Sequence, residues 1–409
     1  MSFQTGLSGL SASSKSLDVI GNNIANANTV GMKASRAEFA DIVSSSLGAS
    51  GAGGAGIGVS MANISQSFTQ GNISITGNNM DVAINGSGFF QVTRPDGSGA
   101  FTRDGQFKID KSGNIVTNTG ANVMGYPTDS AGTPTSVTPQ AMTVPTGASI
   151  AANATSAITA ELNLDARAAV ATPTTSPTQY GTSLTTYDTQ GVPITVNLYF
   201  VKSAVDTWDV YDKSATAQTA ITSGTPGGLF QMKFNPDGSL LSPATAQAMS
   251  ITSPNPNVGT AGVFSANIDV SKATQFGSGF NVSNLTQDGY TAGDLIGVNI
   301  ETSGNITTRY SNGQTMTSGR IALADFRNTQ GLAPTGGGEY LETFASGQPI
   351  QGSPGMGKFG ELRSGALEDS NVDLTAELVN MMTAQRGYQA NAQTIKTQDQ
   401  ILSTLVNLR

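Results

Sequence analysis

The sequence contains neither cysteine nor histidine among its 409 residues. Without cysteine there is no disulfide framework, no thiolate zinc site and no cysteine nucleophile. Without histidine, the Ser-His-Asp and Cys-His arrangements and the usual imidazole metal ligands are excluded as well. These two absences therefore exclude most enzyme classes. We predict no catalytic residue, no cofactor and no metal site, and we expect a protein that is not an enzyme.

Charge is also scarce, since Asp, Glu, Lys and Arg make up 12% of the residues and the formal net charge is −8. No basic cluster exists that could neutralise phosphates, so we expect neither nucleic acid nor an anionic membrane surface as a partner. No apolar run of about eighteen residues predicts membrane insertion. Residues 1–14 lack Lys and Arg, so no cleavable secretory signal is expected. A cytoplasmic location would be the default, but a chain rich in Gly, Ser and Thr without cysteine is typical of proteins outside the cell.

What the chain does have is apolar spacing of helical type at both ends. The C-terminal positions follow one another by steps of four and three and predict one long amphipathic helix. Ser370 and Asp373 have the spacing of a capping box at its start, and Glu368, Asp369 and Glu377 place negative charge there. The seam consists of Leu374, Leu378, Met381, Tyr388, Ile395, Leu402 and Val406, with polar interruptions at Gln385 and Asp399.

The N-terminal stretch has the same spacing, with Ser14 and Gly21 as small residues in the gaps. An ordinary terminal helix packed on a globular core is the plain alternative for either end. Two such helices at opposite ends of a long chain favour contacts between copies of the chain instead. The N-terminal seam consists of Phe3, Leu7, Leu10, Leu17 and Ile24.

Between the ends the apolar pattern alternates, as in strands, and turn signals such as 94–97, 235–238 and 311–313 recur. We predict a mixed α and β fold in which the long helical termini form a coiled-coil-like end domain, followed by two mainly β domains, the second inserted into the first. The predicted domains are 1–30 with 367–409 (terminal helices), 31–70 (a linker region, with a Gly/Ala/Ser stretch at 44–58), 71–149 with 288–366 (middle β domain) and 150–287 (inserted outer β domain).

Four stretches resemble the motifs of bacterial flagellar rod and hook proteins. They are Asn-Asn-Ile-Ala-Asn-Ala-Asn-Thr-Val-Gly-Met-Lys at 22–33, Ala-Ile-Asn-Gly-Ser-Gly-Phe-Phe at 83–90, Phe-Thr-Arg-Asp-Gly at 101–105 and Gln-Arg-Gly-Tyr-Gln-Ala-Asn at 385–391. Met32 stands where many relatives carry an aromatic residue. The long predicted insertion favours the hook members of this family over the shorter distal rod members, which remain an alternative.

The resemblance implies a structural subunit that self-assembles into the curved tube of the flagellar hook, the flexible coupling between rod and filament. It also implies partners: other copies of the chain, the distal rod protein at the base, the hook–filament junction protein at the tip, and hook cap and length-control proteins. Export would follow the flagellar type III route, to a location outside the cell. An alternative from another class is a surface adhesin or carbohydrate-binding β protein, for which Trp208 is the only Trp available as a platform.

The asparagines of the first motif allow two interpretations. They could end the helix, because Asn tolerates left-handed backbone geometry and Gly31 follows as a stop. Their amides could also bond across copies. We expect helix termination from Asn28 and contacts between copies from Asn22 and Asn23. Tyr388 is either a seam aromatic or a hydrogen-bonding anchor at the interface.

Overall fold

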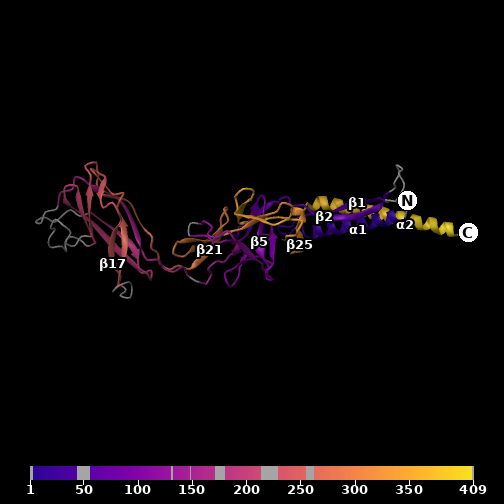
Figure 1. Ribbon diagram of the computed structural model, residues 1–409, viewed down its shortest axis with the longest axis horizontal. Coiled ribbons are helices and arrows are strands. Elements are labelled where there is room, and N and C mark those ends of the chain that lie inside the picture. The colour runs from indigo at the N-terminus through magenta and orange to yellow at the C-terminus, as the bar shows by residue number, and fades with distance from the viewer. Residues whose placement is uncertain are drawn as a thin grey trace. The chain divides into compact units, whose positions relative to one another are not determined.

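The computed structural model describes residues 3–43, 56–129, 132–147, 149–170, 180–212, 229–254 and 262–407. The chain divides into two compact units. Unit 1 takes in 1–147, 296–309 and 315–409, and unit 2 takes in 148–295 and 310–314. The described chain is mostly β with a helix at each end, α1 (Phe3–Ala25) and α2 (Leu374–Asn407) (Figure 1). The prediction of a fold with helical ends and a mainly β middle is confirmed.

Helix α2 begins one residue after Asp373, whose carboxylate Oδ1 accepts hydrogen bonds from the backbone N–H of Thr375 (2.8 Å) and Ala376 (3.2 Å). Asp373 is therefore the N-cap, because its side chain satisfies amide groups that have no partner inside the helix. The capping box that we expected to start at Ser370 is wrong by three positions. Within the described ranges, neither helix has enough hydropathy over a sufficient length to span a bilayer.

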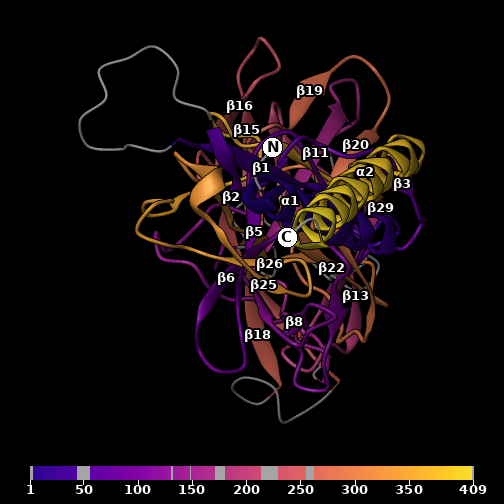
Figure 2. The ribbon, with the colours of Figure 1, turned by 90° about the vertical axis from the view of Figure 1, so that its right-hand side faces the viewer.

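Helix α1 packs between α2 and a β-hairpin made of β1 (Ser35–Val43) and β2 (Gly56–Gln66) (Figure 2). The hairpin is fastened to α1: Ser8 Oγ accepts a hydrogen bond from the N–H of Val59 (3.3 Å), and Asn23 bonds the backbone of Ser35. The expectation of a linker over 31–70 is wrong for these two strands, since backbone pairing and side-chain bonds hold them. Residues 44–55, most of the expected Gly/Ala/Ser stretch, lie outside the described residues.

The rest of unit 1 is built around a 13-stranded sheet with the main order β21-β22-β23-β9-β5-β6-β26-β25. Its aromatic core contains Phe89, Phe101, Phe326 and Tyr340, and the rings of Phe101 and Phe326 meet edge to face at 4.8 Å. The strands are β5 (Phe89–Thr93), β6 (Gly99–Thr102), β7 (Lys108–Ile109), β8 (Ile115–Val116), β9 (Asn122–Tyr126), β10 (Gln140–Ala141), β21 (Leu295–Ile300), β22 (Asn305–Tyr310), β23 (Thr315–Ile321), β24 (Leu323–Asp325), β25 (Ala333–Gly336), β26 (Glu339–Leu341) and β27 (Ile350–Gly352).

Two short pairs connect the ends of the chain to this sheet. Strand β3 (Ile73–Ile75) pairs with β29 (Ala366–Glu368), and β4 (Val82–Asn85) pairs with β28 (Glu361–Ser364). A 3-10 turn, η2 (Thr329–Gly331), precedes β25. Strand β29 leads directly to α2, so the C-terminal helix starts from a strand that is already paired with the N-terminal half of the chain.

Unit 2 consists of two five-stranded sheets whose buried side chains form one core cluster. One sheet has the order β12-β13-β14-β15-β16, and in the other β11 pairs with β18, β19 and β20. The strands are β11 (Ala157–Asp165), β12 (Tyr180–Tyr187), β13 (Pro193–Ala204), β14 (Thr207–Tyr211), β15 (Phe230–Phe234), β16 (Leu240–Ser242), β17 (Gln247–Thr252), β18 (Val263–Asp269), β19 (Thr274–Phe276) and β20 (Asn281–Gln287).

Candidate functional site

The closest approach of α1 to α2 runs through small residues. A Cβ built on Gly6 would lie 3.1 Å from Cγ1 of Ile395, and one on Gly9 would lie 2.9 Å from Nδ2 of Asn391. Further along, a Cβ on Gly387 would lie 3.6 Å from Oγ of Ser13. Gly6, Gly9 and Ser13 follow one another along α1, and their partners on α2 run backwards from Ile395 through Asn391 to Gly387. The two helices are therefore antiparallel. Glycine brings the two backbones together, and larger side chains at these positions would separate them.

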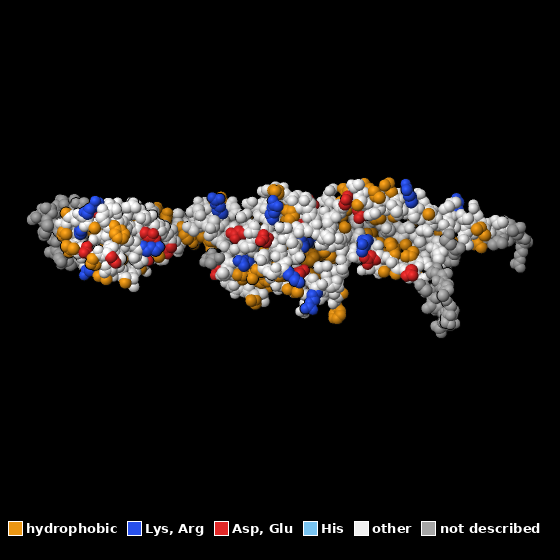
Figure 3. Space-filling model, turned by 90° about the horizontal axis from the view of Figure 1, so that it is seen from above, with side chains coloured by type: hydrophobic (Ala, Val, Ile, Leu, Met, Phe, Trp, Pro, Cys, Tyr) orange, Lys and Arg blue, Asp and Glu red, His pale blue; other side chains and the backbone are white. Residues whose placement is uncertain are grey.

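The predicted seam residues divide into two groups by exposure. Leu10, Leu17, Ile24, Met381 and Ile395 are half-buried, whereas Phe3, Leu7, Leu374, Leu378, Tyr388 and Leu402 are exposed. The side chain of Val406 lies outside the described residues. Figure 3 shows hydrophobic side chains at the surface of unit 1, among few charged ones.

On α1 the apolar seam lies beside the line of contact with α2, whereas on α2 the seam residue Ile395 takes part in the contact. On α1 the contact line passes through Gly6, Gly9 and Ser13, one position before the predicted seam residues Leu7 and Leu10 and the small residue Ser14 in the gap after them. One position is about 100° around a helix, so the seam faces sideways from the contact. Gly21, expected among the seam's small residues, has no atom within 4 Å of a built Cβ. The prediction that this seam meets neighbouring copies is not tested by the contacts within one chain.

Asn23 uses its amide inside the chain. Its Nδ2 donates to the backbone oxygen of Ser35 (2.7 Å) and to Oε1 of Glu377 on α2 (3.2 Å), and its Oδ1 accepts from the N–H of Ser35 (2.9 Å). The residue is buried. The expected hydrogen bond between copies is therefore wrong for Asn23, whose amide joins α1, the hairpin and α2.

The other asparagines lie around the end of α1. Asn22 is exposed, and its Oδ1 accepts from Nδ2 of Asn26 (2.8 Å). A contact of Asn22 between copies stays a prediction. Among the described residues, Asp206 is the non-glycine residue with positive φ, so Asn28 does not supply a left-handed stop. Gly31 does, with φ 71°, and a Cβ there would lie 2.7 Å from the backbone of Arg103.

A buried charge cluster of Lys33, Arg103 and Glu368, here called the Glu368 cluster, lies where the helices join the β-sheets of unit 1. Lys33 Nζ is 2.5 Å from Oε1 of Glu368, and Arg103 Nη1 is 3.0 Å from Oε2. The Gly71 N–H also donates to this carboxylate (2.9 Å), and Lys33 Nζ donates to the backbone oxygen of Thr69 (2.8 Å). Glu368, in the strand that precedes α2, thus joins this strand to the segment that follows α1 and to Arg103. We had expected Glu368 to place its negative charge at the start of the C-terminal helix, and this expectation is wrong.

The surroundings of this cluster are buried and partly aromatic. Arg103 lies over the ring of Phe89, with its guanidinium carbon 5.3 Å from the ring centre. Burial lowers the pKa of the Lys33 ammonium, although the hydrogen bond and charge of Glu368 act in the opposite direction. Burial also raises the pKa of Tyr340 to about 12. The sequence pattern marked Lys33 and Arg103 as motif members but gave no signal that they meet Glu368.

Two hollows border α1 within unit 1. A groove of about 940 Å³ lies between α1, the hairpin and α2, lined by residues such as Val19, Ala37 and Ala384. A second, of about 710 Å³, is lined by residues such as Met32, Phe68 and Tyr340. Within the described ranges, Asp and Glu side chains form no group of three or more that could hold a metal ion.

Trp208, the single Trp, belongs to the core of unit 2. Its side chain is fully buried, and its Nε1 donates to Oε1 of Gln275 at 2.7 Å. Lys202 Nζ lies 5.9 Å from the ring centre. The carbohydrate-binding alternative loses the aromatic platform on which it depended, because a sugar cannot stack on a ring that is already covered.

Four protein-family models match segments that together cover most of the chain. The flagella basal body rod protein model matches residues 3–33, and the flagellar basal body rod FlgEFG protein C-terminal model matches 363–408. The flagellar hook protein FlgE/F/G D1 domain model matches 83–160, and the flagellar basal body protein FlaE D2 domain model matches 163–290. The flagellar hook protein FlgE of Salmonella typhimurium strain LT2 is 42% identical over 425 residues, covering 100% of both chains. The chain belongs to the flagellar hook protein FlgE family.

Other members of the FlgE family are similar over the same length. The FlgE of Escherichia coli K12 is 40% identical over 427 residues, with 100% of both chains covered. The FlgE of Treponema pallidum is 35% identical, covering 99% of this chain and 98% of its own. The crystal structure of Helicobacter pylori FlgE2 matches with a TM-score of 0.54 at 15% identity, covering 72% of this chain and 100% of that one. This last similarity concerns the fold alone.

Proposed function

We propose that this chain is the structural subunit of the flagellar hook, and that it polymerises into the curved tube that transmits torque from the rod to the filament. The observation that carries the proposal is the exposed apolar seam of the paired helices, which a hook subunit would cover with neighbouring copies. The full-length similarity to FlgE proteins supports it. The role is structural and requires no catalytic group.

Assembly follows from the kind of interface. Identical subunits that join through two different patches form an open helical array when each rotation is accompanied by a rise. In this proposal Phe3, Leu7, Leu374, Leu378 and Leu402 supply apolar cohesion, because they are exposed in the single chain. The array has no intrinsic end, so a separate length-control protein would set its length.

The layers of the subunit would have different tasks. We assign the coiled-coil-like end domain to α1 and α2, the middle layer to 71–149 with 288–366, and the outer layer to an inserted domain at 150–287. The division of the chain into two units, with unit 2 formed mainly by 148–295, supports the last assignment. The distal rod protein, the hook–filament junction protein and the hook cap would be further partners, and type III export would deliver the chain.

The test uses Leu378→Asp in the full-length chain. Leu378 is 51% exposed, so the charge can remain solvated in the monomer, whereas it would be buried and unpaired in the polymer. We expect wild-type monomer stability, measured by urea unfolding, together with loss of polymers in sedimentation and electron microscopy. Gln393→Asp, at an exposed polar position of the same helix, is the matched control and should polymerise. Normal tubes from Leu378→Asp would contradict the proposal.

Replacing Ile395 provides the contrast. Ile395 contacts Gly6 within the chain, so Ile395→Asp should weaken the pairing of α1 with α2 in the monomer as well. We expect its helical signal to unfold at lower urea concentration than that of Leu378→Asp. The two variants therefore distinguish loss of assembly from loss of the folded subunit.

A further inference from the structure

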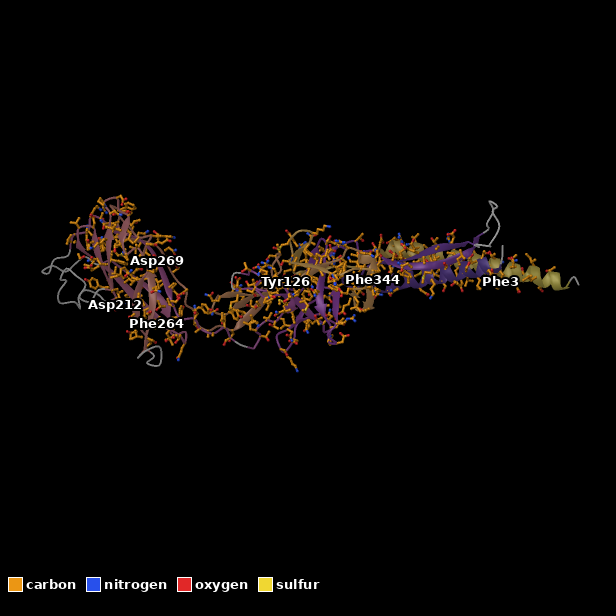
Figure 4. The ribbon with its side chains drawn as sticks, viewed as in Figure 1. Phe3, Tyr126, Asp212, Phe264, Asp269 and Phe344 are labelled. Atoms are coloured by element: carbon orange, nitrogen blue, oxygen red, sulfur yellow. The ribbon has the colours of Figure 1, made fainter. Side chains whose placement is uncertain are left out.

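Phe344 is fully exposed at the tip of a turn that follows β26 in unit 1. Figure 4 labels Phe344 on unit 1, between the labels of Tyr126 and Phe3. Contact between a large apolar side chain and water costs free energy, and burial of the side chain in a partner would recover that free energy. Single exposed apolar residues are common on protein surfaces, so the exposure alone does not indicate a contact.

The turn that carries Phe344 is held rigidly. Thr343 Oγ1 donates to the backbone oxygen of Gly331 (2.6 Å) and accepts from the N–H of Ala345 (3.1 Å) and Ser346 (3.3 Å). Ser346 Oγ donates to the backbone oxygen of Thr343 (2.9 Å) and accepts from its N–H (2.9 Å). Every polar side chain flanking Phe344 in this turn is thus used to fix the backbone.

The turn also packs closely against the segment from Asn328 to Gly331. A Cβ built on Gly331 would be 2.4 Å from the backbone nitrogen of Ser346, so glycine is required for this approach. Asn328 Nδ2 donates to the backbone oxygen of Ala345 (3.0 Å) from the same side. A rigid turn has already lost the conformational entropy that a flexible loop would lose on binding, so the aromatic side chain is preorganised for a partner.

The surroundings limit the kind of partner. Glu342 is the only charged residue in 341–350, and the chain has a net charge of −8, which disfavours an anionic bilayer. A side chain that protrudes from a turn does not form the concave site that a small molecule needs. A protein surface with an apolar recess remains, and in a homopolymer the nearest protein surface is another copy of the chain.

We propose that Phe344 is an assembly anchor that inserts into the neighbouring copy of this chain in the hook. This inference rests on the proposed function, because it requires a polymer. The anchor lies on the β-sheet part of unit 1, outside the helical seam, so it adds a second and separate contact between copies. In head-to-tail packing the anchor of one copy meets a different patch on the next copy.

The absence of cysteine makes a direct test possible. The variant Phe344→Cys carries a single thiol in the full-length chain, and the matched control Val205→Cys carries one at a 77% exposed position of unit 2. Both are reacted with a small maleimide as monomers and as preformed polymers. We expect the thiol of Phe344→Cys to react at least tenfold more slowly in the polymer, and that of Val205→Cys to change less than twofold. In addition, Phe344→Ser should raise the critical concentration for polymerisation roughly tenfold.

The outcomes separate the two proposals. If wild-type chain and Phe344→Cys polymerise and the thiol at position 344 stays as reactive as in the monomer, the anchor is refuted while the hook function stands. Equal slowing at both positions, or an unchanged critical concentration for Phe344→Ser, would also overturn the anchor. If the wild-type chain forms no polymer under any assembly condition, the proposed function fails and the anchor falls with it.

Discussion

Replacing Glu368 by Gln tests whether the Glu368 cluster joins the helices to the β-sheets of unit 1. Glu368 and Lys33 have no exposed side-chain surface, and Arg103 has 6%. Removing one member of a buried ion pair costs about 3–5 kcal/mol, because the remaining charge is uncompensated. Glu368→Gln leaves two buried cations, so we expect a loss at the upper end of this range. Lys33→Met leaves Glu368 bonded to Arg103, and we expect a smaller loss of about 1–3 kcal/mol.

The two units can be followed separately during urea unfolding. Both helices belong to unit 1, and the single Trp belongs to unit 2. Circular dichroism of the helices therefore reports unit 1, and fluorescence of Trp208 reports unit 2. With a slope of about 2–3 kcal/mol per M, a loss of about 5 kcal/mol in Glu368→Gln should lower the midpoint of the helix transition by roughly 2 M. The Trp208 transition should stay at its wild-type midpoint.

An exposed carboxylate of the same unit provides the control for this experiment. Glu342→Gln removes the same charge at the surface and should leave both transitions unchanged. If the helices of Glu368→Gln unfold at the wild-type urea concentration, the cluster does not stabilise unit 1 and our reasoning is refuted. A loss from Lys33→Met that equals or exceeds the loss from Glu368→Gln would show that the carboxylate is not the centre of the cluster.

Two further predictions concern unit 2 and the helix pair. Burial alone would raise the pKa of Asp188, but hydrogen bonds from backbone amides and a serine hydroxyl outweigh it and hold the pKa below its usual value. Its stabilisation is present above about pH 4 and is lost as the pH falls through the lower folded pKa, so Asp188→Asn should flatten the acid dependence of Trp208 unfolding. Gly9→Ala places a Cβ 2.9 Å from Asn391 and should lower helix stability in urea by about 1–3 kcal/mol. Gly21→Ala, which meets no atom within 4 Å, should raise it by about 0.5–1 kcal/mol, and the opposite order of the two glycines would contradict the helix register.

Local pattern predicted much of the β structure. The turn expected at 235–238 follows β15 (Phe230–Phe234) and closes through a hydrogen bond from the N–H of Gly238 to the backbone oxygen of Asn235 (2.9 Å). The turn at 311–313 is confirmed as well, with Gly313 at φ 82°. These features depend on a few adjacent residues, so their signals are complete within a short window of sequence.

The hairpin β1–β2 was missed because its alternation is interrupted. Glu38 pairs with Asn63 and Phe39 pairs with Met61, so Ala62 is an extra residue at a bulge. The apolar residues therefore shift from a spacing of two to a spacing of three, from Met61 to Ile64. A bulge changes the face on which later residues lie, and a search for strict alternation does not recognise it.

The Glu368 cluster could not be found for a different reason. Lys33 and Glu368 are separated by 335 positions, and the contact exists only because β29 pairs with β3 and Gly31 bonds the backbone of Glu368. Periodicity does not encode such pairs. The same limit applies to the contact between the helices: the sequence shows where apolar residues repeat, but the small residues Gly6 and Gly9 decide which side of α1 meets α2.

The register of the two helices leaves a length difference. Gly6 meets Ile395, and α1 begins at Phe3, but α2 continues to Asn407 beyond the start of α1 (Figure 1). Ile401 and Leu402 on this overhang are exposed. In a stack of such subunits one terminal layer would display a ring of bare α2 tails, and the opposite terminal layer would have its tails covered. The two extremities of the tube would then differ chemically, so a protein built to seal one extremity would find no matching surface on the other.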